Sequence, residues 1–280
     1  MRFGNKQQRL EEFARGLATA WSTGSSVELP DTDHRPANRD EAYFVQDRMA
    51  DFIGEPVTGW KAGATSEGMR ARDGHDDIVP GRTFRSRTFV GSRHILEAGP
   101  FIGARMEPEF AFHIDRDILP RDAPWTVDEI RPMATAHIAI EIIANRYPPG
   151  TSGAEIGTLL TIADNGSGSG LVIGDPIADP LAVDFLRHGV ELTVDDGEPA
   201  ENSPPDIRCS PLDALTDVVN CLSARGIALQ EGQYVTTGSA TATLPAPENG
   251  RAVADFGTLG SIVLQFEDTG DQRTKLPRSA

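Results

Sequence analysis

After residue 56 the sequence changes character, and this change limits the folds that are open to the chain. Short apolar runs alternate there with Gly, Pro and Asp, which is typical of strands joined by turns. The runs are VTGWKAGA, TFRSRTFV, EPEFAFHI, AHIAIEII, GLVIG, GVELTV, YVTTGSATA and AVADFGTLGSIVLQF. Helices do not alternate regularly with them, which argues against a doubly wound fold. We therefore expect an α+β protein whose mixed sheet folds over on itself, with helices packed outside.

The N-terminal residues differ from this core because their apolar side chains recur at helical spacing. Residues 6–22 predict one helix. A second helix is predicted over residues 39–53, with Asn38 as its N-cap, Glu41 in the capping-box position and Gly54 at its end. We expect one domain over residues 1–280, divided as follows: a helical segment at 1–55, a catalytic core at 56–267 and a flexible tail at 268–280.

Two helices are predicted inside the core. One follows Thr126 in TVDEIRPMA, where Glu129 completes a capping box. The other is SPLDALTDVVNCLSARG, in which Ser210 caps, Pro211 takes the first helical position and Gly226 ends the helix.

The composition excludes several classes of partner. A formal net charge of −16 repels nucleic acid and anionic membrane surfaces, so we expect neither as a partner. No apolar run is long enough to span a bilayer, and the N-terminus has no apolar core of a signal peptide. The chain has two cysteines, too few for a disulfide framework. We expect a cytoplasmic protein with reduced thiols.

Three glutamates interrupt apolar runs. In a strand Glu107 and Glu109 share one face, while Phe110 and Phe112 point to the other face and the core. The intervening proline, Pro108, lacks an N–H for the ladder, which predicts an edge strand or a strand end. Glu141 stands alone among Ile and Ala, where an unpaired charge would be costly.

Two carboxylates held close together repel each other, and a divalent cation between them removes the repulsion. Oxygen ligands suit Mg²⁺ or Mn²⁺, and Glu141 would supply a third carboxylate. The alternative is a solvated strand face for Glu107 and Glu109 and a salt bridge from Glu141 to Arg146. The spacing alone leaves both possibilities open.

Two other segments carry candidate site residues. In GWKAGATS, Lys61 lies between Gly59 and Gly63, which allow another group to come close. A nearby divalent cation would lower the pKa of Lys61 and fit it for acid–base chemistry; the alternative is a lysine at a sheet edge with its ammonium group in water. In IADNGSGSG, Ser167 lies in a glycine-rich turn that can bind a carboxylate, or is a plain turn.

Taken together and in this order, the motifs resemble one known family. GWKAGATS, EPEFAFHIDRDI, IEIIANRY, IADNGSGSGLVIGD, VTTGSATA and VADFGTLGSIVLQF are similar to the 2-hydroxypentadienoate hydratase and 4-oxalocrotonate decarboxylase family, within the fumarylacetoacetate hydrolase-like superfamily. The resemblance spans residues 40–267. It implies a mixed β-roll of the fumarylacetoacetate hydrolase C-terminal type with peripheral helices, and a homo-oligomer.

The resemblance also implies residue roles. The metal ligands would be Glu107, Glu109 and Glu141, holding Mg²⁺ or Mn²⁺. Lys61 would carry the proton, and Ser167 and Thr65 would bind the substrate.

One segment departs from the family pattern. Hydratases of the family carry a substrate-site aspartate two residues before a glycine, but counting back from Gly81 leads to Val79. Asp76 or Asp77 is the predicted catalytic substitute, which requires a shifted loop, and His75 beside them could join the site.

The function implied by the resemblance is that of a lyase in the breakdown of aromatic compounds. Its substrate would be a 2-oxo or 2-hydroxy alkenoate, and its reaction the hydration of a 2-hydroxydienoate through an enolate held on the metal. The alternatives are decarboxylation of a 2-oxo-enedioate, hydrolysis of a C–C bond, and a non-catalytic protein that binds a 2-oxo acid.

Overall fold

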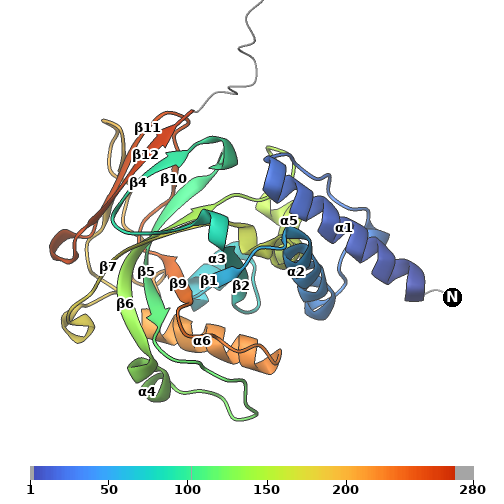
Figure 1. The fold of residues 1–280 in the computed structure, drawn as a ribbon, viewed down its shortest axis with the longest axis horizontal. Helices are drawn as coiled ribbons and strands as arrows, with labels where there is room; N and C mark the ends of the chain where they lie inside the picture. Colours follow the sequence, from blue (N-terminus) through green and yellow to red (C-terminus); the bar gives the residue numbers. More distant parts are fainter. Residues whose placement is uncertain (1–2, 102, 269–280) are drawn as a thin grey trace, which may run out of the picture.

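The computed structural model describes residues 3–101 and 103–268, and in them two β-sheets are flanked by helices (Figure 1). The strands are β1 (Val57–Gly63), β2 (Val79–Phe84), β3 (Thr88–Val90), β4 (Arg93–Glu97), β5 (Arg105–Ile114), β6 (Ala134–Ile143), β7 (Gly168–Pro176), β8 (Glu191–Val194), β9 (Tyr234–Ser239), β10 (Leu244–Pro245), β11 (Gly250–Asp255) and β12 (Ser261–Glu267). The helices are α1 (Phe3–Thr23), α2 (Arg39–Ile53), α3 (Glu67–Asp73), α4 (Val127–Ile130), α5 (Gly153–Ala163) and α6 (Pro211–Ala224). The predicted α+β class is confirmed.

The larger sheet is mixed and curls into a roll. Its strand order is β2-β1-β9-β5-β6-β7-β3, with β10 paired to β5, and β1 with β9 and β3 with β7 are its parallel pairs. The side chain of Asn165 ties β2 to the turn that enters β7: its Oδ1 accepts from Arg82 N at 2.7 Å, and its Nδ2 donates to Arg82 O at 2.8 Å. These two hydrogen bonds have the pattern of a backbone pair in a β-sheet. They link β2, at one end of the strand order, to the start of β7, near the other end.

The two faces of β5 and β6 have different surroundings. Phe110, Phe112 and Ile138 lie in the main hydrophobic core, which also contains apolar residues of α6 and of the smaller sheet, ordered β4-β12-β11-β8. Phe110 packs edge-on against Phe256, with ring centroids 5.7 Å apart. The predicted inward direction of the two phenylalanines is confirmed, and the glutamates therefore face the inside of the roll.

The N-terminal helices form a second core with α5, on the side of β1 and β2 (Figure 1). Leu17, Met49 and Leu160 are buried there, and Trp21 packs edge-on against Phe84 of β2 at 5.3 Å. Both predicted helices are confirmed, and Asn38 Oδ1 accepts the N-capping bond from Glu41 N at 2.9 Å.

Two capping predictions are wrong in detail. The Glu41 carboxylate accepts from Ala37 N at 2.8 Å, one residue before the expected donor. Ser210 precedes α6 but its side chain makes no capping hydrogen bond, so Pro211 alone sets the start. Gly226, with φ of 70°, follows the end of this helix as predicted.

The prediction that Pro108 marks an edge or a strand end is wrong, because β5 lies between β9 and β6. Pro108 O accepts from Ala240 N at 2.8 Å, so the side of the proline that lacks a donor faces the chain just beyond β9. The β5–β9 register also shifts between Glu109 and Ala111. A bulged pairing is the other setting in which a sheet tolerates proline.

Several elements were not predicted: α3, α5, β4 and β10. The run TFRSRTFV is two strands separated by the 3-10 turn Arg85–Arg87. Helix α5 contains Gly157 at φ 62° and ψ 178°, which interrupts the helix just after its first turn and weakens the helical signal.

Most of the predicted tail, from residue 269 onward, lies outside the described residues. The single-domain division remains a prediction. Among the described helices, none combines the length and the apolar character needed to cross a membrane.

Candidate active site

Three glutamates converge inside the roll. Glu107 and Glu109 are two residues apart on β5, and Glu141 of β6 is the direct cross-strand partner of Glu107. One carboxylate oxygen from each lies within 4.8 Å of the other two. Glu109 and Glu141 are each 1% exposed. A solvated strand face, the alternative considered for Glu107 and Glu109, does not describe this arrangement.

Burial and mutual repulsion make this cluster costly without a cation. Burial raises the pKa of Glu107, and burial followed by Glu141 and Glu107 raises the pKa of Glu109 well above its usual value. Burial also raises the pKa of Glu141 to about 7, although Lys61 acts in the opposite direction. A divalent cation would allow all three carboxylates to ionise together.

Glu109 is oriented by the backbone at the end of β9. Its Oε2 accepts from Thr237 N at 2.9 Å and from Gly238 N at 2.8 Å. Because both amides bind Oε2, the other oxygen keeps its lone pairs for a ligand. Such support of a ligating carboxylate is typical of metal sites.

Glu141 provides the clearest test of whether a metal fits. Its Oε2 lies 3.3 Å from the Thr236 hydroxyl, whereas its buried Oε1 has no aligned hydrogen bond and lies 3.1 Å from Lys61 Nζ. Arg146, the other candidate partner, is bound to Asp164 instead. A buried carboxylate oxygen left without a hydrogen bond beside two further carboxylates fits a hard divalent cation.

Three glycines surround the aliphatic part of the Lys61 side chain. A Cβ atom on Gly81, Gly166 or Gly168 would lie 3.1–3.2 Å from a stem carbon of Lys61. Gly81 also faces Asn165 O, which a Cβ would approach to 2.1 Å. The predicted close approach of another chain segment is confirmed, and it involves more glycines than the two beside the lysine.

Lys61 is 4% exposed. In the protein without a cation its pKa is raised, whereas a nearby cation was predicted to lower it. Burial lowers it, but the charges of Glu141, Glu107 and Glu109 together outweigh burial and raise it. The protein alone therefore holds a protonated amine beside the carboxylates.

A cavity of about 210 Å³ opens onto these groups. Glu107, Glu109, Lys61 and Ser167 line it, and so does His75, which the sequence offered as a possible member of the site. Residues of α3 line it as well: Met69, Arg72 and Asp73. The helix that carries these three residues has capping signals in the sequence, because Ser66 caps α3 by accepting from Met69 N at 3.0 Å and Gly74 ends it.

Ser167 reaches the cavity through a strained turn. Asn165 and Ser167 have φ of 54° and 60°, which non-glycine residues rarely adopt. The turn is held by Asp164, whose Oδ1 accepts from Arg146 Nε at 2.5 Å and whose Oδ2 accepts from Arg146 N at 2.9 Å. Such strain persists only where the surroundings fix it, and it is common at functional sites.

The predicted catalytic residues Asp76 and Asp77 do not line the cavity. Asp76 is paired with Arg39 Nη2 at 2.5 Å, and its side chain is 73% exposed. Asp77 Oδ1 accepts from Ile78 N at 2.7 Å. The loop is thus not shifted toward the site, and Val79, two residues before Gly81, lines the cavity.

Thr65, the second predicted substrate-binding residue, is buried and does not line the cavity. Its Oγ1 lies where it would be 2.3 Å from a Cβ atom at position 238, where glycine has φ of 106°. Thr65 therefore packs behind the segment that holds Glu109.

This contact leads to a prediction for Gly238→Ala. The added methyl group would clash with Thr65 Oγ1 and force a strained φ, so we expect a loss of about 1–3 kcal/mol in the free energy of unfolding. Because Gly238 N holds Glu109, the affinity for Mn²⁺ should fall as well. Urea unfolding and calorimetric titration measure the two effects; unchanged metal affinity in the folded variant would contradict the link to Glu109.

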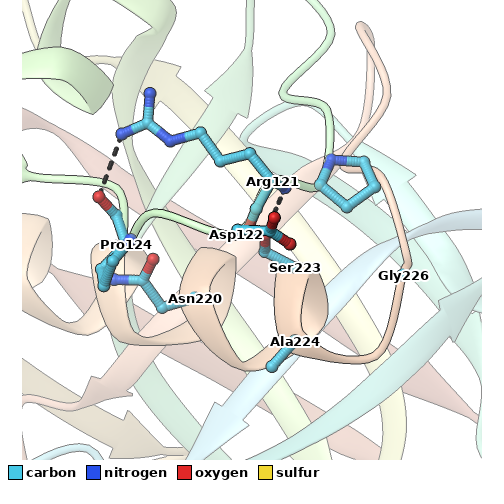
Figure 2. A pocket seen from close by; sticks show the side chains of 8 residues that line it. Arg121, Asp122, Pro124, Asn220, Ser223, Ala224 and Gly226 are labelled. Atoms are coloured by element: carbon cyan, nitrogen blue, oxygen red, sulfur yellow. Dashed lines mark hydrogen bonds between the residues drawn. The ribbon is translucent and has the colours of Figure 1, made fainter.

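A larger hollow, of about 540 Å³, lies between the loop at Arg121 and the end of α6 (Figure 2). Arg121 donates to Pro124 O at 3.0 Å, and its backbone N donates to Ser223 Oγ at 2.9 Å. The Asn220 side chain is bound to the backbone of Trp125, and the carboxylate cluster is not among the residues that line this hollow.

Comparison with known proteins gives consistent results. No protein-family model matches the chain. The chain is 27% identical to a 4-oxalocrotonate decarboxylase of Pseudomonas sp, over 97% of this chain and all of the relative. It is also 27% identical to a 2-hydroxyhexa-2,4-dienoate hydratase of Comamonas testosteroni, over 93% of this chain and 96% of the relative.

Solved structures show the same fold. The 4-oxalocrotonate decarboxylase of Pseudomonas putida G7, crystallised with calcium and acetate and with magnesium and adipate, superposes with a TM-score of 0.79 at 20% identity, over 92% of this chain and 97% of the other. A fumarylpyruvate hydrolase of Pseudomonas aeruginosa with Mn²⁺ and pyruvate gives a TM-score of 0.50 at 15% identity, over 76% and 91%.

The curled sheet thus places the chain among proteins with the fumarylacetoacetate hydrolase-like fold. Within them, the curated relatives confirm the narrower resemblance, to the hydratase and decarboxylase family. The roles of individual residues remain predictions.

Proposed function

We propose that this protein is a divalent-metal-dependent lyase acting on a 2-oxo or 2-hydroxy alkenoate, and that its main reaction adds water to a 2-hydroxydienoate. One observation carries the proposal. Glu107, Glu109 and Glu141 bring carboxylate oxygens within 4.8 Å of one another, beside the buried amine of Lys61. The adjoining cavity of about 210 Å³ has room for a small keto acid.

Each residue would have a defined task. The three glutamates would hold Mg²⁺ or Mn²⁺. When bound, the cation would act as a Lewis acid toward the 2-oxo oxygen and neutralise the substrate carboxylate. Lys61 would move the proton that interconverts the enol and keto forms, and Ser167 would bind the substrate carboxylate. Thr65 supports Gly238, and no contact with the cavity supports its role in substrate binding.

Decarboxylation of a 2-oxo-enedioate is the second candidate, and Val79 favours it. Loss of carbon dioxide needs an electron sink and a proton donor but no activated water. An apolar side chain in place of the hydratase acid is compatible with that reaction. The relatives include enzymes named for each activity.

A panel of 2-hydroxydienoates and 2-oxo-enedioates, with and without Mg²⁺, would test the proposal. We expect Mg²⁺-dependent loss of the conjugated ultraviolet absorbance, with a hydrated product and no carbon dioxide. Release of carbon dioxide from an enedioate would establish the second candidate instead. Turnover that survives complete chelation would contradict the metal-dependent mechanism.

Self-association in the cytoplasm is also proposed. Four large apolar side chains are exposed, and a second copy of this chain could cover some of them: Val90, Ile95, Leu119 and Leu181. Light scattering during size-exclusion chromatography would measure the mass, and a strictly monomeric protein would contradict a homo-oligomer.

A further inference from the structure

Among the described residues that line the cavity, His75 is the only one with an aromatic ring. Its backbone N donates to Arg70 O at 3.0 Å, directly after the left-handed Gly74 that ends α3. Its Nδ1 lies 2.9 Å from Thr158 Oγ1. Thr158 Oγ1 also lies 3.3 Å from Gly74 O, and a hydroxyl that donates its single proton to that carbonyl accepts from His75. On this pattern we assign the ring hydrogen to Nδ1, which leaves the lone pair on Nε2.

Apart from the glutamates and Ser167, to which the proposed function gives other tasks, the acids and hydroxyls that line the cavity are already engaged. Asp73 lines the cavity, but Arg72 binds both of its oxygens at 2.7 Å. Thr161 donates to Gly157 O at 2.8 Å, and Ser239 donates to Thr241 O at 2.8 Å. Apart from the glutamate cluster, His75 Nε2 is the base left uncommitted among the described lining residues.

We propose that His75 is the general base that activates water in the hydration reaction, taking the place of the acid that Val79 replaces. This inference rests on the proposed hydratase function. Lys61 first moves the proton that converts the 2-hydroxydienoate into its 2-oxo-3-alkenoate form, with the 2-hydroxyl losing a proton and C5 gaining one. His75 Nε2 then accepts one proton of the water, the water oxygen bonds to C4, and the electron pair of the C3=C4 bond moves toward the 2-oxo oxygen to give an enolate. Lys61 supplies a proton to C3, and the imidazolium of His75 releases its proton to solvent, from which the amine of Lys61 regains one.

The protonation state of His75 agrees with this role. Burial lowers its pKa; Asp73 opposes this, Arg39 adds to it, and Asp76 and Lys61 act in opposite directions, with a lowered pKa as the net result. The ring is therefore neutral near pH 7, the form that can accept a proton.

The test separates hydration from the proton transfer assigned to Lys61. In His75→Asn, the amide nitrogen occupies the place of Nδ1 and can still donate to Thr158, whereas Nε2 is lost. With Mg²⁺ present, we expect hydration of 2-hydroxypentadienoate to fall by at least about 100-fold. Deuterium exchange at the carbon next to the carbonyl of 2-oxopentanoate, which has no double bond to hydrate, should continue at the wild-type rate.

A second variant and a control complete the experiment. Added imidazole should restore part of the hydration in His75→Ala, which a purely structural role would not allow. His94→Asn, at a histidine held by Gly91 O in the smaller sheet, should hydrate normally. Hydration at the wild-type rate in folded His75→Asn would overturn the proposal. A wild-type protein that exchanges but never hydrates would refute the hydratase function, and the role of His75 with it.

Discussion

Glu107→Gln is expected to abolish metal-dependent turnover without harming the fold. Within the described residues no hydrogen bond to the Glu107 carboxylate is found, so the amide breaks no existing contact, and one of three repelling charges is removed. Losing a ligand should cost about 3 kcal/mol or more in transition-state stabilisation, which is at least about a 100-fold loss of kcat/KM. The free energy of unfolding of the metal-free protein should stay the same or rise, because the carboxylates repel one another.

Calorimetric titration with Mn²⁺ and urea unfolding would measure these two effects on the same variant. Glu97→Gln, at an exposed carboxylate of β4, is the matched control and should bind metal normally. A Glu107→Gln protein that retains both its metal affinity and its activity would remove Glu107 from the metal site.

Lys61→Met is expected to stop proton exchange while metal binding persists. The unbranched methionine side chain should fit the narrow space between Gly81, Gly166 and Gly168, so the cavity should keep its shape. Loss of a general acid–base group typically costs about 10²–10⁴-fold, and we expect deuterium exchange into 2-oxopentanoate to fall by that factor. Binding of Mn²⁺ should be at least as tight as in the wild type, because Glu141 no longer pairs with an ammonium group.

Nuclear magnetic resonance in D₂O would follow the exchange, and calorimetry the metal. If exchange continues unchanged in the folded variant, another group carries the proton, and His75 would be the next to examine. Lys6→Met, at a partly buried ion pair with Glu41 on the N-terminal helices and away from the cavity, is a control that should exchange normally.

The carboxylate cluster could be predicted from sequence because its geometry follows from strand periodicity. Glu107 and Glu109 share a face by the alternation of side chains, and Glu141 is expensive to bury unless something binds it. That Glu141 lies directly opposite Glu107 depends on strand register, which the sequence did not determine. The resemblance to the family provided what the local pattern could not.

The cavity wall was harder to predict because it is built from weak local signals. Helix α3 is short and polar, and α5 is interrupted by a glycine with a positive φ, so neither gives a clear apolar stripe. Asp76 was a reasonable choice by position, but its pairing with Arg39 of α2 draws it to the surface. The error at Pro108 has a similar cause: the proline is tolerated by an irregular neighbouring strand, which leaves no trace near residue 108 itself.

The two hydrogen bonds between the Asn165 side chain and the Arg82 backbone also bear on when the site forms during folding. The two partners are 83 positions apart in the chain, and Gly81 beside these bonds touches both Asn165 and the stem of Lys61. The amine of Lys61 therefore reaches its final surroundings only when the hydrogen bonds between Asn165 and Arg82 have formed. A chain in which this contact has not formed would carry Lys61 and the three glutamates without the surroundings that the folded site gives them.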